Sequence, residues 1–166
     1  MTQDAGAGAV VVGLFHIAIK TAQLSASLDF YRNVLGLRDV PRPDFGFPGA
    51  WLACPTPGGS AIIHLYAGGP ALAGGSTVAS GTASIDHVSL ACTGFHAFRS
   101  RFQLHRLNWR EFLVPGTTLW QLFVYDPSGV QFELTFEGAA EAGPLPDMSA
   151  DRGYIAGSNF FEVPAA

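Results

Sequence analysis

The chain has 166 residues, of which 48% are hydrophobic and only 13% are charged. This length allows one large domain or two small modules that share a core. The abundant glycine and proline favour a sheet-rich protein with many turns. The net charge is −4, and no basic stripe is present that could neutralise phosphates. The composition therefore excludes nucleic-acid binding as a main function.

The cysteines and the N-terminal residues indicate the cellular compartment. Cys54 and Cys92 are too few for a disulfide framework and do not form a CxxC pair, so we expect a reducing environment. Residues 1–13 have no basic region and only a short apolar run, which predicts neither a signal peptide nor a membrane span. We therefore expect a cytoplasmic protein without a membrane partner.

The first part of the chain has the pattern of a β-α-β-β-β unit. Residues 10–20 alternate and are rich in β-branched side chains, which predicts a strand. A helix with apolar residues on one face should follow, with Thr21 as its cap and Gly36 at its end. Residues 37–66 contain Pro and Gly turns between short apolar runs, and the last run, residues 61–66, predicts a strand.

The pattern then restarts after a break. Residues 67–84 have the composition of a flexible linker. Residues 85–91 predict a strand, and residues 94–107 predict a helix with three phenylalanines on one face. Two further strands are expected at residues 118–125 and 130–136, joined by the strong turn sequence Asp-Pro-Ser-Gly.

These two copies define the expected fold class. Residues 10–66 and 85–137 predict an α+β protein of two paired βαβββ modules. One copy alone would leave a face of its sheet exposed, so we expect the two to pair and form a cupped mixed sheet. Residues 138–166 predict an irregular tail. Three apolar residues suggest that the end of this tail docks on another part of the chain: Phe160, Phe161 and Val163.

Four side chains that can bind a metal lie in apolar, strand-like runs at matching places in the two copies: His16, His64, His87 and Glu133. His16 corresponds to His87, and His64 corresponds to Glu133. A single histidine on an apolar strand is more often a core residue, whereas four at matching places predict a metal site in the cup. Mixed histidine and carboxylate ligands suit Fe, Zn, Ni, Co or Mn better than Ca or Mg.

Alternation along the strands predicts which neighbours share the cup with these ligands. Neutral polar side chains should point inward beside them: Tyr66, Ser89, Gln131 and Thr135. The strands that carry His64, His87 and Glu133 add no cationic side chain. Asp86 is either a partner that orients a ligand histidine or a solvated carboxylate at the strand edge. A substrate could bind the metal through two oxygens at the open positions.

Four features closely resemble the vicinal oxygen chelate superfamily: the sequence SLDFYRNVLGL at residues 27–37, the strand with His16 before it, the start of the second copy at Ile85-Asp86-His87-Val88, and the turn at residues 126–129 followed by Glu133. This superfamily includes glyoxalase I, fosfomycin and bleomycin resistance proteins, methylmalonyl-CoA epimerase and the extradiol dioxygenases. The resemblance covers residues 10–137, and it implies paired βαβββ modules around a divalent metal.

The resemblance implies roles for particular residues. His16, His87 and Glu133 match the usual set of two histidines and one glutamate. His64 stands where glyoxalase I has a glutamate that is both ligand and catalytic base. In a metal-dependent lyase or isomerase that removes a proton next to a carbonyl, the base would therefore be Glu133 or a metal-bound hydroxide. Three side chains could orient the substrate: Tyr66, Tyr125 and Gln131.

Two other functions remain open within the superfamily. An Fe(II) ring-cleaving dioxygenase would use the same ligands. Such enzymes resemble this chain in these ligands but have an acid/base tyrosine at the position of Phe123, for which Tyr125 could substitute, and their additional histidine has no match in residues 112–119. A non-catalytic drug-binding protein is disfavoured by the full set of four ligands. We expect a homodimer that binds a small-molecule substrate, with Ser89, Phe123 and Gln131 among the residues that contact it.

Overall fold

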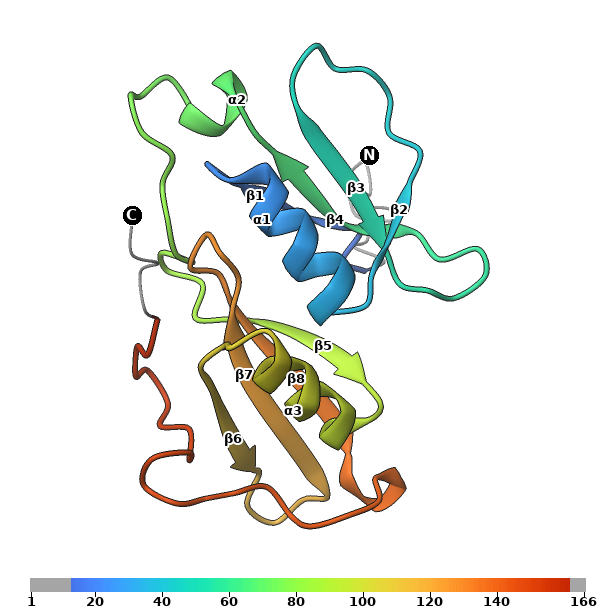
Figure 1. The fold of residues 1–166 in the computed structure, drawn as a ribbon, viewed down its shortest axis with the longest axis vertical. Coiled ribbons are helices and arrows are strands. Elements are labelled where there is room, and N and C mark those ends of the chain that lie inside the picture. The colour runs from blue at the N-terminus through green and yellow to red at the C-terminus, as the bar shows by residue number, and fades with distance from the viewer. Residues whose placement is uncertain (1–12, 162–166) are drawn as a thin grey trace, which may run out of the picture.

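Two β-α-β-β-β modules lie side by side in the computed structural model, which describes residues 13–161 (Figure 1). The first module consists of β1 (Ile17–Lys20), α1 (Leu24–Asp29), the π-helical turn η1 (Phe30–Val34), β2 (Arg38–Val40), β3 (Gly49–Ala53) and β4 (Ala61–Tyr66). Its sheet has the order β1-β4-β3-β2, and β1 runs parallel to β4. The predicted strand at residues 61–66 is confirmed.

Two details at the start of this module differ from the sequence prediction. Within the described residues the first strand begins at Ile17, so His16 lies directly before it, and residues 10–12 of the predicted strand lie outside the described residues. Thr21 is not the helix cap, because Gln23 occupies that position. The Thr21 hydroxyl instead accepts a hydrogen bond from the Gln23 N–H at 3.0 Å and holds the turn before the helix. Gly36 does end the helix, with a φ of 74° that glycine adopts without strain.

The second module repeats the order of elements with β5 (Val88–Cys92), α3 (Phe95–Leu104), β6 (Trp109–Leu113), β7 (Leu119–Tyr125) and β8 (Gln131–Glu137). Its sheet order is β5-β8-β7-β6, with β5 parallel to β8. The predicted helix is confirmed with slightly narrower bounds, and its three phenylalanines are buried. The segment between the modules contains a short helix, α2 (Gly69–Leu72). A 3-10 turn, η2 (Gly138–Ala140), follows β8.

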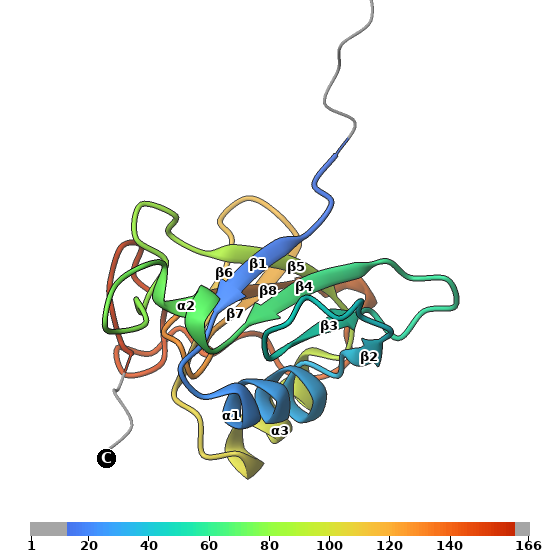
Figure 2. The same cartoon turned by 90° about the horizontal axis from the view of Figure 1, so that it is seen from above.

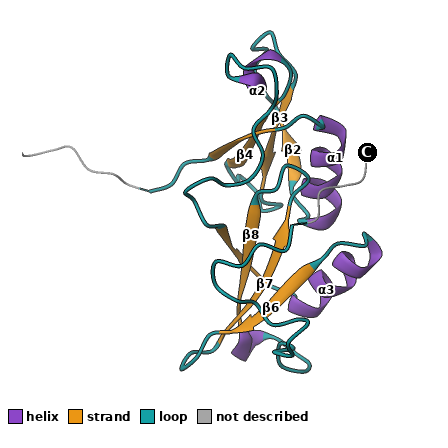
Figure 3. Cartoon of the chain, turned by 90° about the vertical axis from the view of Figure 1, so that its left-hand side faces the viewer, coloured by secondary structure: helices purple, strands orange, loops and turns teal. Residues whose placement is uncertain are grey.

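The main helices cover only one face of each sheet (Figures 2 and 3). The helices α1 and α3 lie next to each other on the same side of the two sheets, and no described helix covers the opposite side (Figures 2 and 3). Alternating side chains on the covered side form one continuous apolar core that draws residues from both modules. At the centre of that core, the rings of Phe30 and Tyr31 contact the ring of Phe132 in the other module.

The residues after β8 dock along the second sheet. The backbone of Glu111 on β6 accepts a hydrogen bond from the Tyr154 N–H and donates one to the Arg152 carbonyl, each at 2.9 Å. Further along, Phe160 and Phe161 pack against Tyr125. The expected docking of the tail is therefore confirmed for these two residues, whereas Val163 lies outside the described residues.

Two further features concern the cysteines and the helices of the described residues. Cys54 and Cys92 are free thiols, and burial raises the pKa of Cys92 to about 12, so this thiol stays protonated near neutral pH. Among residues 13–161, no helix is long and apolar enough to cross a membrane.

A buried hydrogen bond joins the two modules. The Tyr31 hydroxyl donates to Asp126 Oδ2 at 2.8 Å, and both residues are at most 1% exposed. The other carboxylate oxygen accepts hydrogen bonds from the backbone N–H groups of Ser128 and Val130. Loss of solvation raises the pKa of Asp126 and, together with the nearby carboxylate, raises that of Tyr31. The predicted turn at residues 126–129 is thus confirmed, and it also binds the first module.

We predict that Tyr31→Phe lowers the free energy of unfolding by about 1–3 kcal/mol, because one oxygen of a buried carboxylate loses its donor. Urea denaturation followed by circular dichroism measures the change. Tyr66→Phe is the control, since Tyr66 is only partly buried and packs against Phe47. Equal stabilities of the two variants would show that the bond between the modules contributes nothing net.

Candidate metal centre

The two histidines of the first module stack on each other. Their ring centroids are 3.9 Å apart and their planes differ by 16°. His64 lies on β4, between β1 and β3, and Trp51 on β3 stacks on the same imidazole at 4.4 Å. Because Trp51 and His16 come from opposite sides of β4, the His64 ring is held between them. The imidazole ring of His64 therefore has little freedom to rotate.

The electrostatics of this pair suit metal binding. His64 is only 6% exposed, and its pKa is lowered by loss of solvation and by the nearby charges of His16 and Arg42. Its imidazole is thus neutral at pH 7, which is the form that binds metal ions. His16 Nδ1 is buried and has no hydrogen-bond partner among residues 13–161. A buried polar atom without a partner is costly, and a metal ion would satisfy it.

The second module forms a pair of a histidine and a carboxylate. His87, directly before β5, places its Nε2 3.3 Å from Glu133 Oε2 on β8. The hydroxyls of Ser89 and Thr135 donate to Glu133 Oε1 at 2.6 and 2.7 Å, so the other oxygen of this carboxylate faces the imidazole. Asp86 Oδ1 lies 2.6 Å from His87 Nδ1. A carboxylate in this position fixes the orientation of the ring, as is usual for histidines that bind metals.

The four predicted ligands therefore occur as two pairs, one in each module. Among residues 13–161, no three His, Cys, Asp or Glu side chains lie close enough together to hold a metal ion. The sequence suggested one common cup, whereas the described chain brings together only His16 with His64 and His87 with Glu133. The two pairs approach the same seam, because His16 and Ser89 both line a small cavity of about 110 Å³ between β1 and β5.

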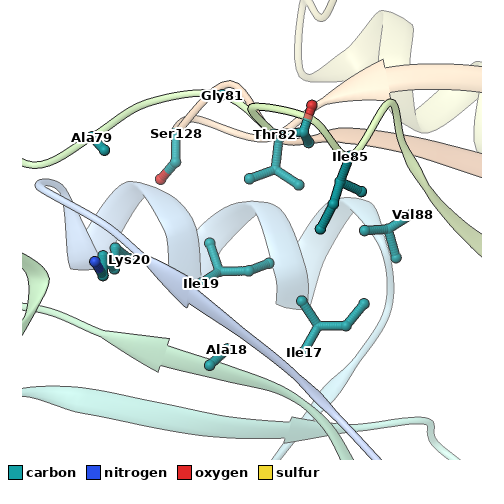
Figure 4. A pocket seen from close by; sticks show the side chains of 11 residues that line it. Ile17, Ala18, Ile19, Lys20, Ala79, Gly81, Thr82, Ile85, Val88 and Ser128 are labelled. Atoms are coloured by element: carbon teal, nitrogen blue, oxygen red, sulfur yellow. The ribbon is translucent and has the colours of Figure 1, made fainter. Parts of the chain in front are cut away.

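Another cavity at this seam has a different character. It measures about 230 Å³ and lies between β1 and residues 79–85. Figure 4 shows aliphatic side chains of β1, Ile17 and Ile19, on the side of Ile85 and Val88. Lys20 is the only charged residue in its lining, and none of the four ligands contributes. This cavity marks the contact between the modules and does not belong to the two pairs of candidate ligands.

The remaining predicted site residues are distributed over both modules. Phe123 lies opposite Glu133 in the strand register and stands edge-on to His87 at 5.7 Å. Gln131 is buried, and its Oε1 accepts a hydrogen bond from the Tyr125 hydroxyl at 2.5 Å. Tyr66 belongs to the first module, where its ring contacts Phe47. The Tyr125 hydroxyl is therefore engaged with Gln131 and does not stand free in the site.

Sequence reasoning missed two residues near the pairs. The Arg42 guanidinium lies 4.8 and 4.7 Å from the ring centres of Phe45 and Phe47, and its charge acts on His64. Tyr154, from the tail, stacks on Phe123 at 3.6 Å with an interplanar angle of 8°. Both come from irregular segments, where strand alternation carries no information about side-chain direction.

A buried carboxylate anchors the segment that carries Tyr154. Glu111 is fully buried, and its Oε1 lies 3.0 Å from Arg99 Nε of α3 and accepts a hydrogen bond from the Trp109 indole. Its Oε2 accepts a hydrogen bond from the backbone N–H of Asp147 at 2.9 Å. The side chain of Glu111 therefore connects the tail, the helix and β6.

Comparison with known proteins agrees with this architecture. Residues 13–134 match the Glyoxalase/Bleomycin resistance protein/Dioxygenase superfamily, and the chain belongs to this family. It is 28% identical over 138 residues to the Arabidopsis thaliana protein named Glyoxylase I 4, a match that covers 81% of this chain and 76% of the relative. The resemblance seen in the sequence is thereby confirmed.

Solved structures share the fold at low sequence identity. Lactoylglutathione lyase from Agrobacterium tumefaciens aligns with a TM-score of 0.56 at 15% identity, over 78% of this chain and 96% of that chain. A mutant of the fosfomycin resistance protein FosX from Listeria monocytogenes, complexed with Mn(II) and 1S,2S-dihydroxypropylphosphonic acid, aligns with a TM-score of 0.55 at 15% identity. That match covers 75% of this chain and 92% of the other.

We predict that Glu111→Gln loosens the tail and destabilises the fold by about 3–5 kcal/mol, because the charge of Arg99 loses its partner in a buried setting. Limited proteolysis should cut the variant between residues 141 and 161 faster than the wild type. Asp151→Asn, at an exposed position on the same segment, is the matched control and should behave like the wild type. Unchanged proteolysis of Glu111→Gln would contradict the anchoring role.

Proposed function

We propose that this protein is a divalent-metal-dependent lyase or isomerase of the glyoxalase type. Its substrate would be a small molecule that binds the metal through two vicinal oxygens. The observation that carries the proposal is the pairing of His87 with Glu133, in which two hydroxyls hold one carboxylate oxygen and leave the other beside the imidazole nitrogen. The neutral His64, stacked on His16, supplies a second pair of nitrogen ligands.

The fold neighbours support this class of chemistry. One of them is a lactoylglutathione lyase, and another was solved with Mn(II) and a molecule that carries two adjacent hydroxyls. The four donors, three imidazoles and one carboxylate, suit Mn, Fe, Co, Ni or Zn. The His16 Nδ1 atom, which is buried without a partner in the described part of the chain, fits a metal as well.

We infer that a second copy of the chain completes the centre. The two pairs do not form a cluster of three or more ligands within the described chain. Large apolar side chains next to both pairs are exposed: Leu14 (83%), Phe15 (74%) and Ile85 (60%). Such exposed apolar residues mark surfaces that a partner covers. In a twofold dimer, the first pair of one chain can face the second pair of the other at two equivalent sites.

Each residue of the site would have its own chemical role in the reaction. A bound divalent ion would supply Lewis-acid stabilisation of the charge that develops on a substrate oxygen. Glu133 would take the proton next to the carbonyl through Oε2, while Ser89 and Thr135 hold Oε1 in place. Asp86 would keep the His87 ring oriented. The positive charge of Arg42 near His64 would favour a substrate that also carries an anionic group.

We predict that His16→Ala/His64→Ala and His87→Ala/Glu133→Ala each abolish tight metal binding, because each double variant lacks one of the two pairs. When the two variants are co-expressed, half of the dimers contain one chain of each variant. In such a dimer, one site combines the two intact pairs and the other site combines the two mutated pairs. Elemental analysis of the purified mixture should therefore find roughly one quarter of the wild-type metal content.

The arrangement of the pairs decides the outcome of this complementation. If the centre formed within one chain, the mixture would contain no intact site, and its metal content would equal that of the separate variants. Thermal melting of each variant serves as the control for folding. Size-exclusion chromatography of the wild type should show a dimer.

The reaction class has its own test. The metal-loaded protein, incubated in D₂O with 2-oxoaldehyde–thiol adducts and 2-hydroxyacyl thioesters, should introduce deuterium next to the carbonyl, as measured by NMR. Glu133→Gln should slow this exchange by about 10²–10⁴-fold, the usual contribution of a general base. Absence of exchange with all these substrates, or oxygen consumption with a catechol on the Fe(II)-loaded protein, would contradict the lyase or isomerase.

A further inference from the structure

Tyr154 brings a phenol to the second metal-binding pair from outside the repeated modules. Its ring lies flat on Phe123 at 3.6 Å, and Phe123 is the residue directly opposite Glu133 in the sheet. The backbone of the same segment is fixed to β6 by the hydrogen bond from the Tyr154 N–H to the Glu111 carbonyl. Position 154 lies beyond residues 13–134, which match the family, so this phenol belongs to the chain's own tail.

The hydrogen bonds around Tyr154 have a definite direction. The Tyr125 hydroxyl donates to Gln131 Oε1 at 2.5 Å, and Gln131 Nε2 donates to the Tyr154 oxygen at 3.1 Å. The Tyr154 oxygen therefore acts as an acceptor towards Gln131, and its own proton must point elsewhere. A chain of this kind polarises each hydroxyl in turn and makes the last one a better donor.

The proton of Tyr154 has only a weak partner among the described residues. Asp86 Oδ1 lies 3.5 Å from the Tyr154 oxygen, longer than the 2.5–3.0 Å of an ordinary O–H···O hydrogen bond. The same Asp86 oxygen is only 2.6 Å from His87 Nδ1. The Tyr154 hydroxyl thus lies beside the carboxylate that contacts His87, with a proton that a bound molecule could accept.

We propose that Tyr154 donates a hydrogen bond to one of the two vicinal oxygens of the substrate and stabilises the negative charge on it. This inference rests on the proposed function and adds a substrate-contacting residue to it. The ring alone would provide only packing on Phe123, and phenylalanine would pack equally well. The hydroxyl, directed by Gln131 and Tyr125, provides the donor. Tyr125, the strand tyrosine, acts through this chain and is a positioning residue.

The test uses 4-nitrocatechol, a coloured molecule with two vicinal oxygens, and the full-length protein loaded with Mn(II). Tyr154→Phe should weaken binding of 4-nitrocatechol by about tenfold, the usual effect of losing one hydrogen bond to a charged oxygen. In Tyr154→Phe, the absorbance of bound 4-nitrocatechol should also show that the second hydroxyl of this molecule loses its proton at a higher pH than in the wild type. The reason is that the anionic oxygen no longer receives a hydrogen bond from the Tyr154 hydroxyl. Tyr125→Phe should produce smaller changes in the same direction.

Two measurements separate this role from a structural one. Mn(II) affinity and thermal stability of Tyr154→Phe should equal those of the wild type, since the ring stack on Phe123 is kept. Ile155→Ala, at the exposed neighbouring position, is the matched control and should bind 4-nitrocatechol like the wild type.

Each alternative result has a clear meaning. Binding of 4-nitrocatechol by Tyr154→Phe within twofold of the wild type overturns the role of Tyr154 and leaves the proposed function standing. A parallel loss of Mn(II) affinity shows a structural role and overturns it as well. Failure of the Mn(II)-loaded wild type to bind 4-nitrocatechol overturns both the role of Tyr154 and the proposed chelation.

Discussion

The arrangement of the two modules depends on the buried hydrogen bond from Tyr31 to Asp126. Tyr31 lies on the helical side of the first module, and Asp126 opens the turn between β7 and β8 in the second. A carboxylate in the core needs hydrogen bonds, and this one has three, of which only the bond from Tyr31 crosses the seam. The bond adds to the apolar contacts of Phe30 and Tyr31 with Phe132, which join the two modules on the side of the helices.

The open faces explain why polar and ionisable side chains can stand on apolar strands. On β8, Phe132 and Leu134 point into the core, while Gln131, Glu133 and Thr135 alternate with them. Hydroxyl groups and one imidazole are the polar partners of this row. The same alternation places His64 opposite Trp51 on the other sheet. Each module thus presents one pair of candidate metal ligands, and among residues 13–161 the two pairs do not form a common cluster.

The charged groups of the second module serve two different purposes. Glu111 points into the core and binds the tail to α3 and β6, whereas Glu133 points to the open face and pairs with His87. Both carboxylates are buried, but only Glu133 has an oxygen facing an imidazole nitrogen. Because Glu111 and Arg110 interrupt the apolar pattern of β6, this strand is not among those predicted from the sequence. Burial of a carboxylate is therefore not by itself a sign of a catalytic site.

The sequence by itself determined the two modules, most of their strands and helices, and the four ligand candidates, because periodic apolar patterns and matching positions in a repeat are local properties of the chain. It also indicated the family. Only the tertiary structure decided that the ligands form two separate pairs, that Tyr125 is engaged with Gln131, and that Arg42 and Tyr154 lie close to the pairs. These facts depend on the paths of loops and the tail, which contacts between distant residues determine and no local pattern records.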